Sequence, residues 1–386
     1  MSRLASRVIA LVGVFVLTIT GLVTASVAWA APQPEAGTVL STTDITDRRD
    51  AKVAGAGKVI AMTYLSEDPK GQLIPVRGTV MIPAKAPRPG GWRVLGYAHG
   101  TAGLGDQCTV TGRMGFEGRY DDWLGPWLKD GYVITATEYA GIGGPGVHAY
   151  LDGEVSGKNV LDSVRAARTV VAQQGGSTSS GYITSGASQG GHASLWSASL
   201  AGTYAPELTN VGGVASSPPV NIADYFQLLR PGVPPVAVPD YVTYFSYVMA
   251  GLKVARPDLD VDSYLTPLGR KVVEDAKTLC YPNQGRATRG MNVGQLIARP
   301  FDQGPLIPAL REATGVPTSG YGAPMLVQQG TLDPVSFAPL TTQFVDEMRT
   351  DGADVDFRQA QAGHGLGAWA ETEALQWSNA QQWPGR

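Results

Sequence analysis

The chain has few of the residues that mark several large classes of protein. Only two of its 386 residues are cysteine and four are histidine, and the net charge is −3. No run of Lys or Arg occurs in the body of the chain, so we expect no nucleic acid as a partner. No Cys/His cluster has the spacing of metal ligands, and we expect neither a metal nor another cofactor. The apolar content of 43% is ordinary, which argues against both disorder and a polytopic membrane protein.

The N-terminus differs from this average composition. Arg3 and Arg7 precede a largely apolar run of 16 residues, Val8–Val23, and the sequence Ala28-Trp-Ala30 follows. This order of basic, apolar and small residues predicts a secretory signal peptide over residues 1–30, cleaved near Ala30. The run is short for a membrane span, so an uncleaved anchor is the less favoured alternative. We therefore expect a secreted protein, either released or retained at the cell surface.

The two cysteines, Cys108 and Cys280, both lie in the exported part of the chain. In an oxidising compartment a disulfide between them is favoured over the alternative of two separate buried thiols.

Hydrophobic periodicity predicts one α/β domain with an insertion. Residues 31–57 form an extended arm, and an alternating hairpin of Lys58–Ser66 and Leu73–Ile82 follows. From Arg93 onward strands and helices alternate, which is typical of a mostly parallel sheet with helices on both faces. This core comprises residues 31–217 and 322–386. Its expected strands are Arg93–Ala98, Tyr132–Thr137, Val211–Ala215, Met325–Gln329 and Val355–Ala360, and its expected helices are Tyr120–Lys129, 155–173, 192–204, Pro339–Thr350 and Ala368–Gln382.

Residues 218–321 break this alternation, because they are rich in proline and carry helical rather than strand patterns. We predict a mainly helical cap, or lid, in which Pro267 interrupts a helical stretch over Asp260–Leu279. One helical face of this cap carries four apolar or aromatic residues, Tyr241, Tyr244, Phe245 and Val248. The stripe either packs as ordinary core, which is the favoured interpretation, or lines a path for an acyl chain or forms a mobile lid.

A strand, a sharp turn and a helix are predicted around Gly186-Ala-Ser-Gln-Gly190. Small residues on both sides of Ser188 permit the strained turn that exposes a nucleophilic serine at the edge of a sheet. The pattern alone is weak evidence, because 49 residues of the chain are glycine. A nucleophile needs partners elsewhere in the chain.

A serine hydroxyl becomes nucleophilic when a histidine can take its proton. His364 is the best candidate, since it follows the last strand in a loop flanked by glycines. Of the other histidines, His99 and His148 lie upstream in loops after strands, and His192 would point away from Ser188. Loops after parallel strands meet at one edge of the sheet.

Asp333 is the expected acid, because it follows a strand and gives the chain order Ser, Asp, His that is typical of an α/β-hydrolase. As an alternative, Asp333 could merely cap a helix. Four further aspartates are weaker candidates, because they lie on a helix or at the opposite edge of the sheet: Asp346, Asp351, Asp354 and Asp356.

The oxyanion that develops during acyl transfer needs donors placed in advance. The backbone N–H of Gln189 is one candidate, because it follows the nucleophile. The second is expected in the loop after Arg93–Ala98, at Thr101, with Gly100 as the alternative. His99 is expected to shape this loop rather than to titrate in catalysis.

With these residues assigned, the sequence resembles the secretory lipases of the α/β-hydrolase superfamily, the lipase A type. The resemblance covers most of the exported chain, and its most specific parts are the segments 138–151 and 161–167. Glu138 stands where the family pattern has Asp. The segments that carry the resemblance are Tyr97–Gly103, Glu138–Gly143, His148–Leu151, Val160–Ala167, Gly186–Gly190, Gly330–Asp333 and Gly363–Gly365.

The resemblance implies an α/β-hydrolase fold, a triad of Ser188, Asp333 and His364, and hydrolysis of fatty acyl esters such as triacylglycerols. We expect a monomer that acts on lipid or small ester substrates and that contacts lipid aggregates at their interface. Two alternatives stay open: an acyltransferase or peptidase that uses the same triad, and a non-enzymatic surface protein on a hydrolase scaffold.

Overall fold

A mixed sheet of nine strands runs through the part of the chain that the structure describes. The computed structural model describes residues 34–113 and 121–384, so the predicted signal peptide lies outside the described residues. Within these residues no helix combines the length and the apolar character needed to cross a membrane.

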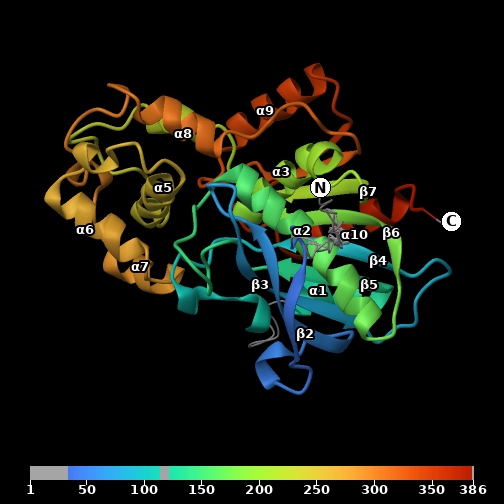
Figure 1. Ribbon diagram of the computed structural model, residues 1–386. Helices are drawn as coiled ribbons and strands as arrows, with labels where there is room; N and C mark the ends of the chain where they lie inside the picture. The colour runs from blue at the N-terminus through green and yellow to red at the C-terminus, as the bar shows by residue number, and fades with distance from the viewer. Residues whose placement is uncertain (1–33, 114–120, 385–386) are drawn as a thin grey trace, which may run out of the picture. The chain divides into compact units, whose positions relative to one another are not determined.

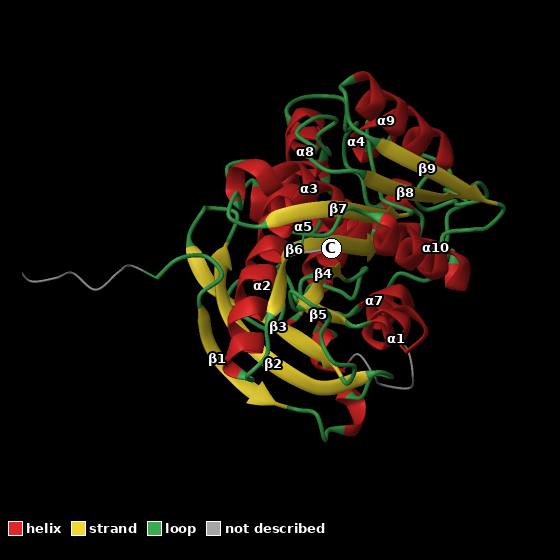
Figure 2. Ribbon diagram, turned by 90° about the vertical axis from the view of Figure 1, so that its right-hand side faces the viewer, coloured by secondary structure: helices red, strands yellow, loops and turns green. Residues whose placement is uncertain are grey.

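The strand order is β1-β2-β3-β5-β4-β6-β7-β8-β9, and Figure 2 shows β1 and β9 at opposite ends of the sheet. The pairs from β1 to β3, and β3 with β5, are antiparallel, while all pairs from β5 to β9 are parallel. The predicted α/β-hydrolase architecture, a mostly parallel sheet flanked by helices, is therefore confirmed. The strands are β1 (Val39–Asp44), β2 (Ala56–Glu67), β3 (Leu73–Pro83), β4 (Trp92–Ala98), β5 (Tyr132–Thr137), β6 (Thr178–Ala187), β7 (Thr209–Ser216), β8 (Met325–Gly330) and β9 (Val355–Ala360).

Five helices pack on the two faces of this sheet. Helices α1 (Asp121–Asp130) and α10 (Gly367–Ala380) cover one face, and α2 (Gly153–Gln173), α3 (Gln189–Tyr204) and α9 (Ala338–Thr350) cover the other. Two strands between these layers, β5 and β8, are fully buried and expose no residue on either face. Two-sided burial explains why these strands read as continuous apolar runs rather than as alternating patterns.

The 108 residues between β7 and β8, residues 217–324, contain helices and no strand, and the structure describes all of them. In Figure 1 helices α5, α6 and α7 lie beside one another, away from the strands. These helices share a hydrophobic cluster that includes Phe226, Phe245, Val273 and Phe301. The proposed cap, residues 218–321, has boundaries in the loops that leave β7 and enter β8. Its helices are α4 (Ile222–Phe226), α5 (Tyr241–Ala255), α6 (Pro267–Ala276), α7 (Tyr281–Ala287) and α8 (Leu306–Thr314), with short 3-10 turns at Val261–Tyr264 and Val293–Gln295.

Two details differ from the sequence-based expectation. The extended arm contains strand β1, which pairs with β2 at the edge of the sheet. Five of the six residues of β1 are exposed, so the strand has no buried face and hence no alternation to detect. Pro267 does not interrupt a helix. It begins α6, where its missing N–H costs nothing, and Thr266 caps that helix by accepting from the N–H of Gly269.

Candidate active site

Ser188 lies at a sharp turn between β6 and α3, as the sequence predicts. Its backbone has φ 57° and ψ −123°, a conformation that non-glycine residues rarely adopt. Two backbone hydrogen bonds hold the turn: Ser188 N–H donates to Ser216 O at 2.9 Å, and His192 N–H donates to Ser188 O at 3.0 Å. The serine is thus fixed at the carboxyl edge of the parallel strands.

The glycines on both sides of Ser188 are required by close contacts. A Cβ atom on Gly190 would lie 1.9 Å from the carbonyl oxygen of Ala98, and one on Gly186 would lie 2.4 Å from the backbone of Gly190. The turn therefore packs directly against the end of β4, and larger residues at these positions would push the two strand ends apart.

His364 lies between Ser188 and Asp333. Its Nε2 atom is 2.9 Å from Ser188 Oγ, and its Nδ1 atom is 2.9 Å from Asp333 Oδ2. Because a carboxylate oxygen accepts, the Nδ1–H donates to Asp333, which leaves Nε2 of the neutral ring free to accept the serine proton. The Asp333 side chain is fully buried, whereas His364 is 23% exposed. The structure thus brings the three predicted residues together in one hydrogen-bonded row.

Asp333 is held in place by its own loop. Its Oδ1 atom accepts from the backbone N–H groups of Val335 and Ser336, at 2.8 and 3.0 Å. Helix α9 begins later, at Ala338, so these bonds close a turn and do not cap a helix. The alternative that Asp333 caps a helix is therefore wrong.

Gln329, the residue before the last of strand β8, bonds Asp333 and was not predicted from the sequence. Its Nε2 donates to Asp333 Oδ2 at 3.3 Å and to Ser336 O at 2.9 Å, while its Oε1 accepts from Thr341 at 3.0 Å. A pair of glutamines in an otherwise apolar buried strand was the available signal, because a buried amide needs partners.

The two predicted oxyanion donors lie in buried or half-buried surroundings. Gln189 is 2% exposed, and its N–H opens helix α3 directly after Ser188. Its side-chain amide lies 2.7 Å from His148 Nε2. Thr101 lies in the loop after β4, where its hydroxyl is 2.7 Å from the hydroxyl of Tyr150. Each predicted donor residue therefore has its side chain held by a residue of the segment 148–151.

Glu138 and His99 fix the loop that carries Thr101. The buried Glu138 carboxylate accepts from the N–H groups of Val110 and Thr111 and from the Thr111 hydroxyl, at 2.6 to 3.0 Å. His99 lies 3.8 Å from the same carboxylate, and its Nδ1–H donates to Gly100 O at 2.7 Å. Glu138 thus organises the loop at the position where the family pattern has Asp.

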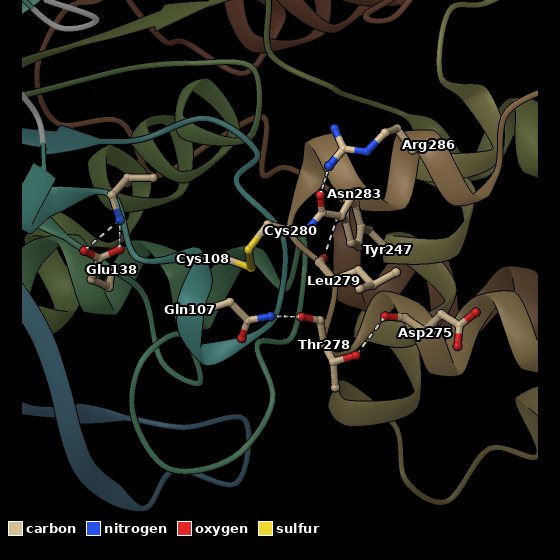
Figure 3. The surroundings of a disulfide bond; sticks show 11 residues. Gln107, Cys108, Glu138, Tyr247, Asp275, Thr278, Leu279, Cys280, Asn283 and Arg286 are labelled. Atoms are coloured by element: carbon tan, nitrogen blue, oxygen red, sulfur yellow. Dashed lines mark hydrogen bonds between the residues drawn. A yellow bond between two sulfur atoms is a disulfide. The ribbon is translucent and has the colours of Figure 1, made fainter. Parts of the chain in front are cut away.

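The predicted disulfide between Cys108 and Cys280 is present, and it joins this loop to the start of α7 (Figure 3). The two residues are separated by 172 positions in the sequence. Additional contacts surround the bond: Tyr281 N–H donates to Ala102 O at 2.9 Å, and the Gln107 amide donates to Thr278 O. The loop after β4 and the helical segment are therefore attached to each other beside the candidate oxyanion site.

A cavity of about 480 Å³ opens beside Ser188. Its wall is almost entirely apolar and comes from α4, α5, the loop between them and the residues that follow Asp333. All four residues of the stripe on α5 line it, and two of them, Phe245 and Val248, are also buried in the hydrophobic cluster of the helical segment. The favoured interpretation of the stripe as core packing therefore describes only part of its environment.

No group of three or more His, Cys, Asp or Glu side chains that could hold a metal ion is found among the described residues. The titratable groups that are hydrogen-bonded in a row with Ser188 are His364 and Asp333. A serine hydroxyl bonded to a histidine, a buried carboxylate that orients this histidine and an adjoining apolar cavity together suit acyl transfer from an ester.

The chain is similar in sequence to known lipases. The family described as secretory lipase matches residues 118–290. The sequence is 26% identical to lipase A of Moesziomyces aphidis over 247 residues, which cover 61% of this chain and 50% of that protein. It is 32% identical to a secreted triacylglycerol lipase of Malassezia furfur over 107 residues, 28% of this chain and 27% of that protein. The chain spans about half the length of the lipase A that it matches, and less of the second relative.

Two solved structures share the fold over most of both chains. Candida antarctica lipase A in its closed state has a TM-score of 0.69 and 20% identity, covering 89% of this chain and 83% of that chain. The rice cell wall degrading esterase LipA of Xanthomonas oryzae has a TM-score of 0.73 and 18% identity, covering 90% and 96%. The chain thus resembles the secretory lipases in sequence, and it has the α/β-hydrolase fold of lipases and esterases.

Proposed function

We propose that the protein is a secreted carboxylic ester hydrolase, a lipase or esterase, that cleaves fatty acyl esters such as triacylglycerols. The observation that carries this proposal is the position of His364, which bonds Ser188 Oγ and the buried Asp333 at the edge of an apolar cavity. The similarity to secreted lipases supports both the reaction and the extracellular location. An apolar cavity suits an acyl chain better than a polar substrate.

In the proposed mechanism Ser188 Oγ attacks the ester carbonyl while His364 Nε2 takes its proton. The backbone N–H groups of Gln189 and of Thr101, with Gly100 as the alternative, stabilise the oxyanion. His364 then protonates the leaving alcohol, and an activated water releases the acid from the acyl-enzyme. Asp333 keeps the histidine in the correct tautomer and stabilises its charged form. No step needs a cofactor.

A panel of p-nitrophenyl esters of rising chain length, together with triolein and a peptide, tests this proposal. We expect turnover of esters, with the preferred chain length set by the cavity, and no cleavage of the peptide. Peptide cleavage without ester turnover would support the peptidase alternative, and transfer of the acyl group to an added alcohol in preference to water would support the acyltransferase. If a fluorophosphonate probe did not label Ser188 in the folded protein, this result would support the non-enzymatic alternative.

Large apolar side chains are exposed around the mouth of the cavity. Leu228 and Phe337 both line it and are 57% and 55% exposed. Apolar side chains gathered at the entrance of a lipid-binding cavity favour contact with a lipid surface. We therefore propose that this rim, formed by Leu228 and Phe337, contacts lipid aggregates. We also propose that the protein is a monomer, which sedimentation velocity checks.

Replacing Leu228 and Phe337 together by serine tests the rim. We expect activity on emulsified triolein to fall on the order of tenfold, because losing about 1.4 kcal/mol of apolar contact changes an equilibrium by that factor. Hydrolysis of soluble p-nitrophenyl acetate should change less than about twofold, since a short ester needs no interface. Leu73→Ser is the matched control: Leu73 is 40% exposed on β3, outside the cavity. An equal loss on both substrates would contradict a role at the interface.

A further inference from the structure

The segment His148–Leu151 precedes α2 and contacts both candidate oxyanion residues. We call it the 148–151 loop. All four residues are at most 5% exposed, although the segment is neither helix nor strand. Leu151 has φ 61°, and two short-range hydrogen bonds close the loop: Tyr150 N–H to His148 O at 3.0 Å and Asp152 N–H to Ala149 O at 2.9 Å. An irregular segment buried this completely has one backbone conformation.

His148 contacts the side chain of Gln189. Its Nδ1 lies 3.0 Å from Ala140 O, which can only accept, so Nδ1 carries the hydrogen. Burial lowers the pKa of His148 to about 4, so the ring is neutral near pH 7 and Nε2 is an acceptor. The amide Nε2 of Gln189 donates to it at 2.7 Å. The stacked ring of Tyr139, 5.3 Å away, fixes the plane of the imidazole. The residue after the nucleophile is thus held in one orientation.

Tyr150 contacts the other candidate donor, Thr101. The two hydroxyl groups are 2.7 Å apart, and the tyrosine is 5% exposed. Helix α5 packs against Tyr150 and fixes its position. A Cβ atom on Gly251 would lie 2.5 Å from Tyr150 N and 2.6 Å from Tyr150 O, so the helix backbone packs directly on the loop. The ring of Tyr247, 5.7 Å away, packs against it as well.

We propose that His148 and Tyr150 are positioning residues of the oxyanion hole: His148 orients Gln189, and Tyr150 orients Thr101. The inference rests on the proposed ester hydrolysis, because the oxyanion forms only in acyl transfer. One loop then sets the spacing between two donors that come from different strand ends, one after β4 and one after β6. Donors must lie within about 0.5 Å of the productive geometry to stabilise the transition state, and removal of one donor costs roughly 10²–10³ in rate. Loss of support should cost less, since the donor itself remains.

The chain provides a matched control for each of these residues. His192 is as buried as His148, has its pKa lowered to about 4 by the same burial, and bonds one backbone carbonyl, Thr314 O, at 2.9 Å. This side-chain bond involves neither donor residue, and substitution keeps the backbone N–H of residue 192 that donates to Ser188 O. Tyr264 is a buried tyrosine whose hydroxyl donates to Gln303 O at 2.9 Å. Substitution of the controls should therefore affect stability but not the oxyanion hole.

The test compares His148→Leu with His192→Leu, and Tyr150→Phe with Tyr264→Phe, in the full chain. We expect His148→Leu to lower kcat for p-nitrophenyl butyrate by about 10- to 100-fold and Tyr150→Phe by about 5- to 30-fold, with KM changed less than threefold. Affinity for a trifluoromethyl ketone, which forms a tetrahedral oxyanion on the serine, should fall by the same factors. His148→Gln, which can still accept from Gln189, should recover part of the loss. The two control variants should keep kcat within twofold.

A double-mutant cycle identifies the path of the effect. In a Gln189→Met background, where the side-chain amide is absent, His148→Leu should lower kcat by less than twofold more. Two results would overturn the inference while ester hydrolysis itself remained intact. One is full additivity of the two substitutions in this cycle. The other is a kcat of His148→Leu and of Tyr150→Phe that lies within twofold of their controls. Absence of ester turnover and of fluorophosphonate labelling in the unmodified protein would remove the proposed function and this inference together. If His148→Leu does not fold, Tyr150→Phe, which deletes one oxygen atom, gives the decisive comparison.

Discussion

Replacing Ser188 by alanine is expected to lower kcat for ester hydrolysis on the order of 10⁶-fold and to abolish labelling by a fluorophosphonate probe. The change removes the hydroxyl that bonds His364 Nε2, so no covalent acyl-enzyme can form. The variant keeps the positive φ of residue 188, and the backbone strain should be similar because alanine, like serine, carries a Cβ atom. Stability should therefore change little, and the far-ultraviolet circular dichroism spectrum should stay the same.

The matched control is Ser185→Ala, because Ser185 lies on β6 three residues before the turn and belongs to the same buried strand. It should keep kcat within about twofold and label normally. Asp333→Asn should be intermediate, with a loss of about 10⁴-fold, because an amide holds the His364 ring in the wrong tautomer. If Ser188→Ala kept more than a few per cent of the wild-type activity, a different nucleophile would have to be sought.

Removal of the Cys108–Cys280 bond is expected to have the largest effect on stability. With 172 residues in the loop, the chain-entropy argument predicts a loss of about 5 kcal/mol in the free energy of unfolding for Cys108→Ser with Cys280→Ser. Urea unfolding followed by tryptophan fluorescence measures this loss. Because the chain has two cysteines, a reductant acting on the unmodified protein can break only this bond.

The reductant also supplies the control for that experiment. Dithiothreitol should shift the urea midpoint of the unmodified protein to that of the double variant and should leave the double variant unchanged. The contacts beside the disulfide, such as Tyr281 N–H to Ala102 O, remain available without it, so the reduced protein should still fold and hydrolyse esters at low temperature. A midpoint that does not respond to reduction would show that the bond contributes nothing to stability.

The sequence was sufficient to predict which three residues meet at the carboxyl edge of the sheet. Ser188, Asp333 and His364 each follow a strand, and parallel strands bring such positions to one edge of the sheet. Strand Tyr132–Thr137 was also predicted with its observed bounds, because its buried run ends abruptly at loops. In these cases local pattern and tertiary position carry the same information.

The supporting residues could not be predicted in this way. The contact between His148 and Gln189 joins positions 41 apart in the sequence, and neither residue's type indicates the other. The contact between Tyr150 and Thr101 could not be predicted for the same reason. Helical periodicity did identify the stripe on α5, yet it could not distinguish a wall of the cavity from the interior of the cluster. That distinction depends on where α4 packs, which is a property of the whole chain.

The attachment of α7 to the loop after β4 has a consequence for exchanging parts between related enzymes. The helical segment is joined to that loop by a disulfide and by the bond from Tyr281 to Ala102, and α5 packs on Tyr150. A graft that transplanted residues 218–321 alone would leave Cys108 unpaired and would replace the surface on which Tyr150 rests. A transferable unit therefore consists of three pieces that are discontinuous in sequence: the helical segment, the loop of residues 99–111 and the 148–151 loop.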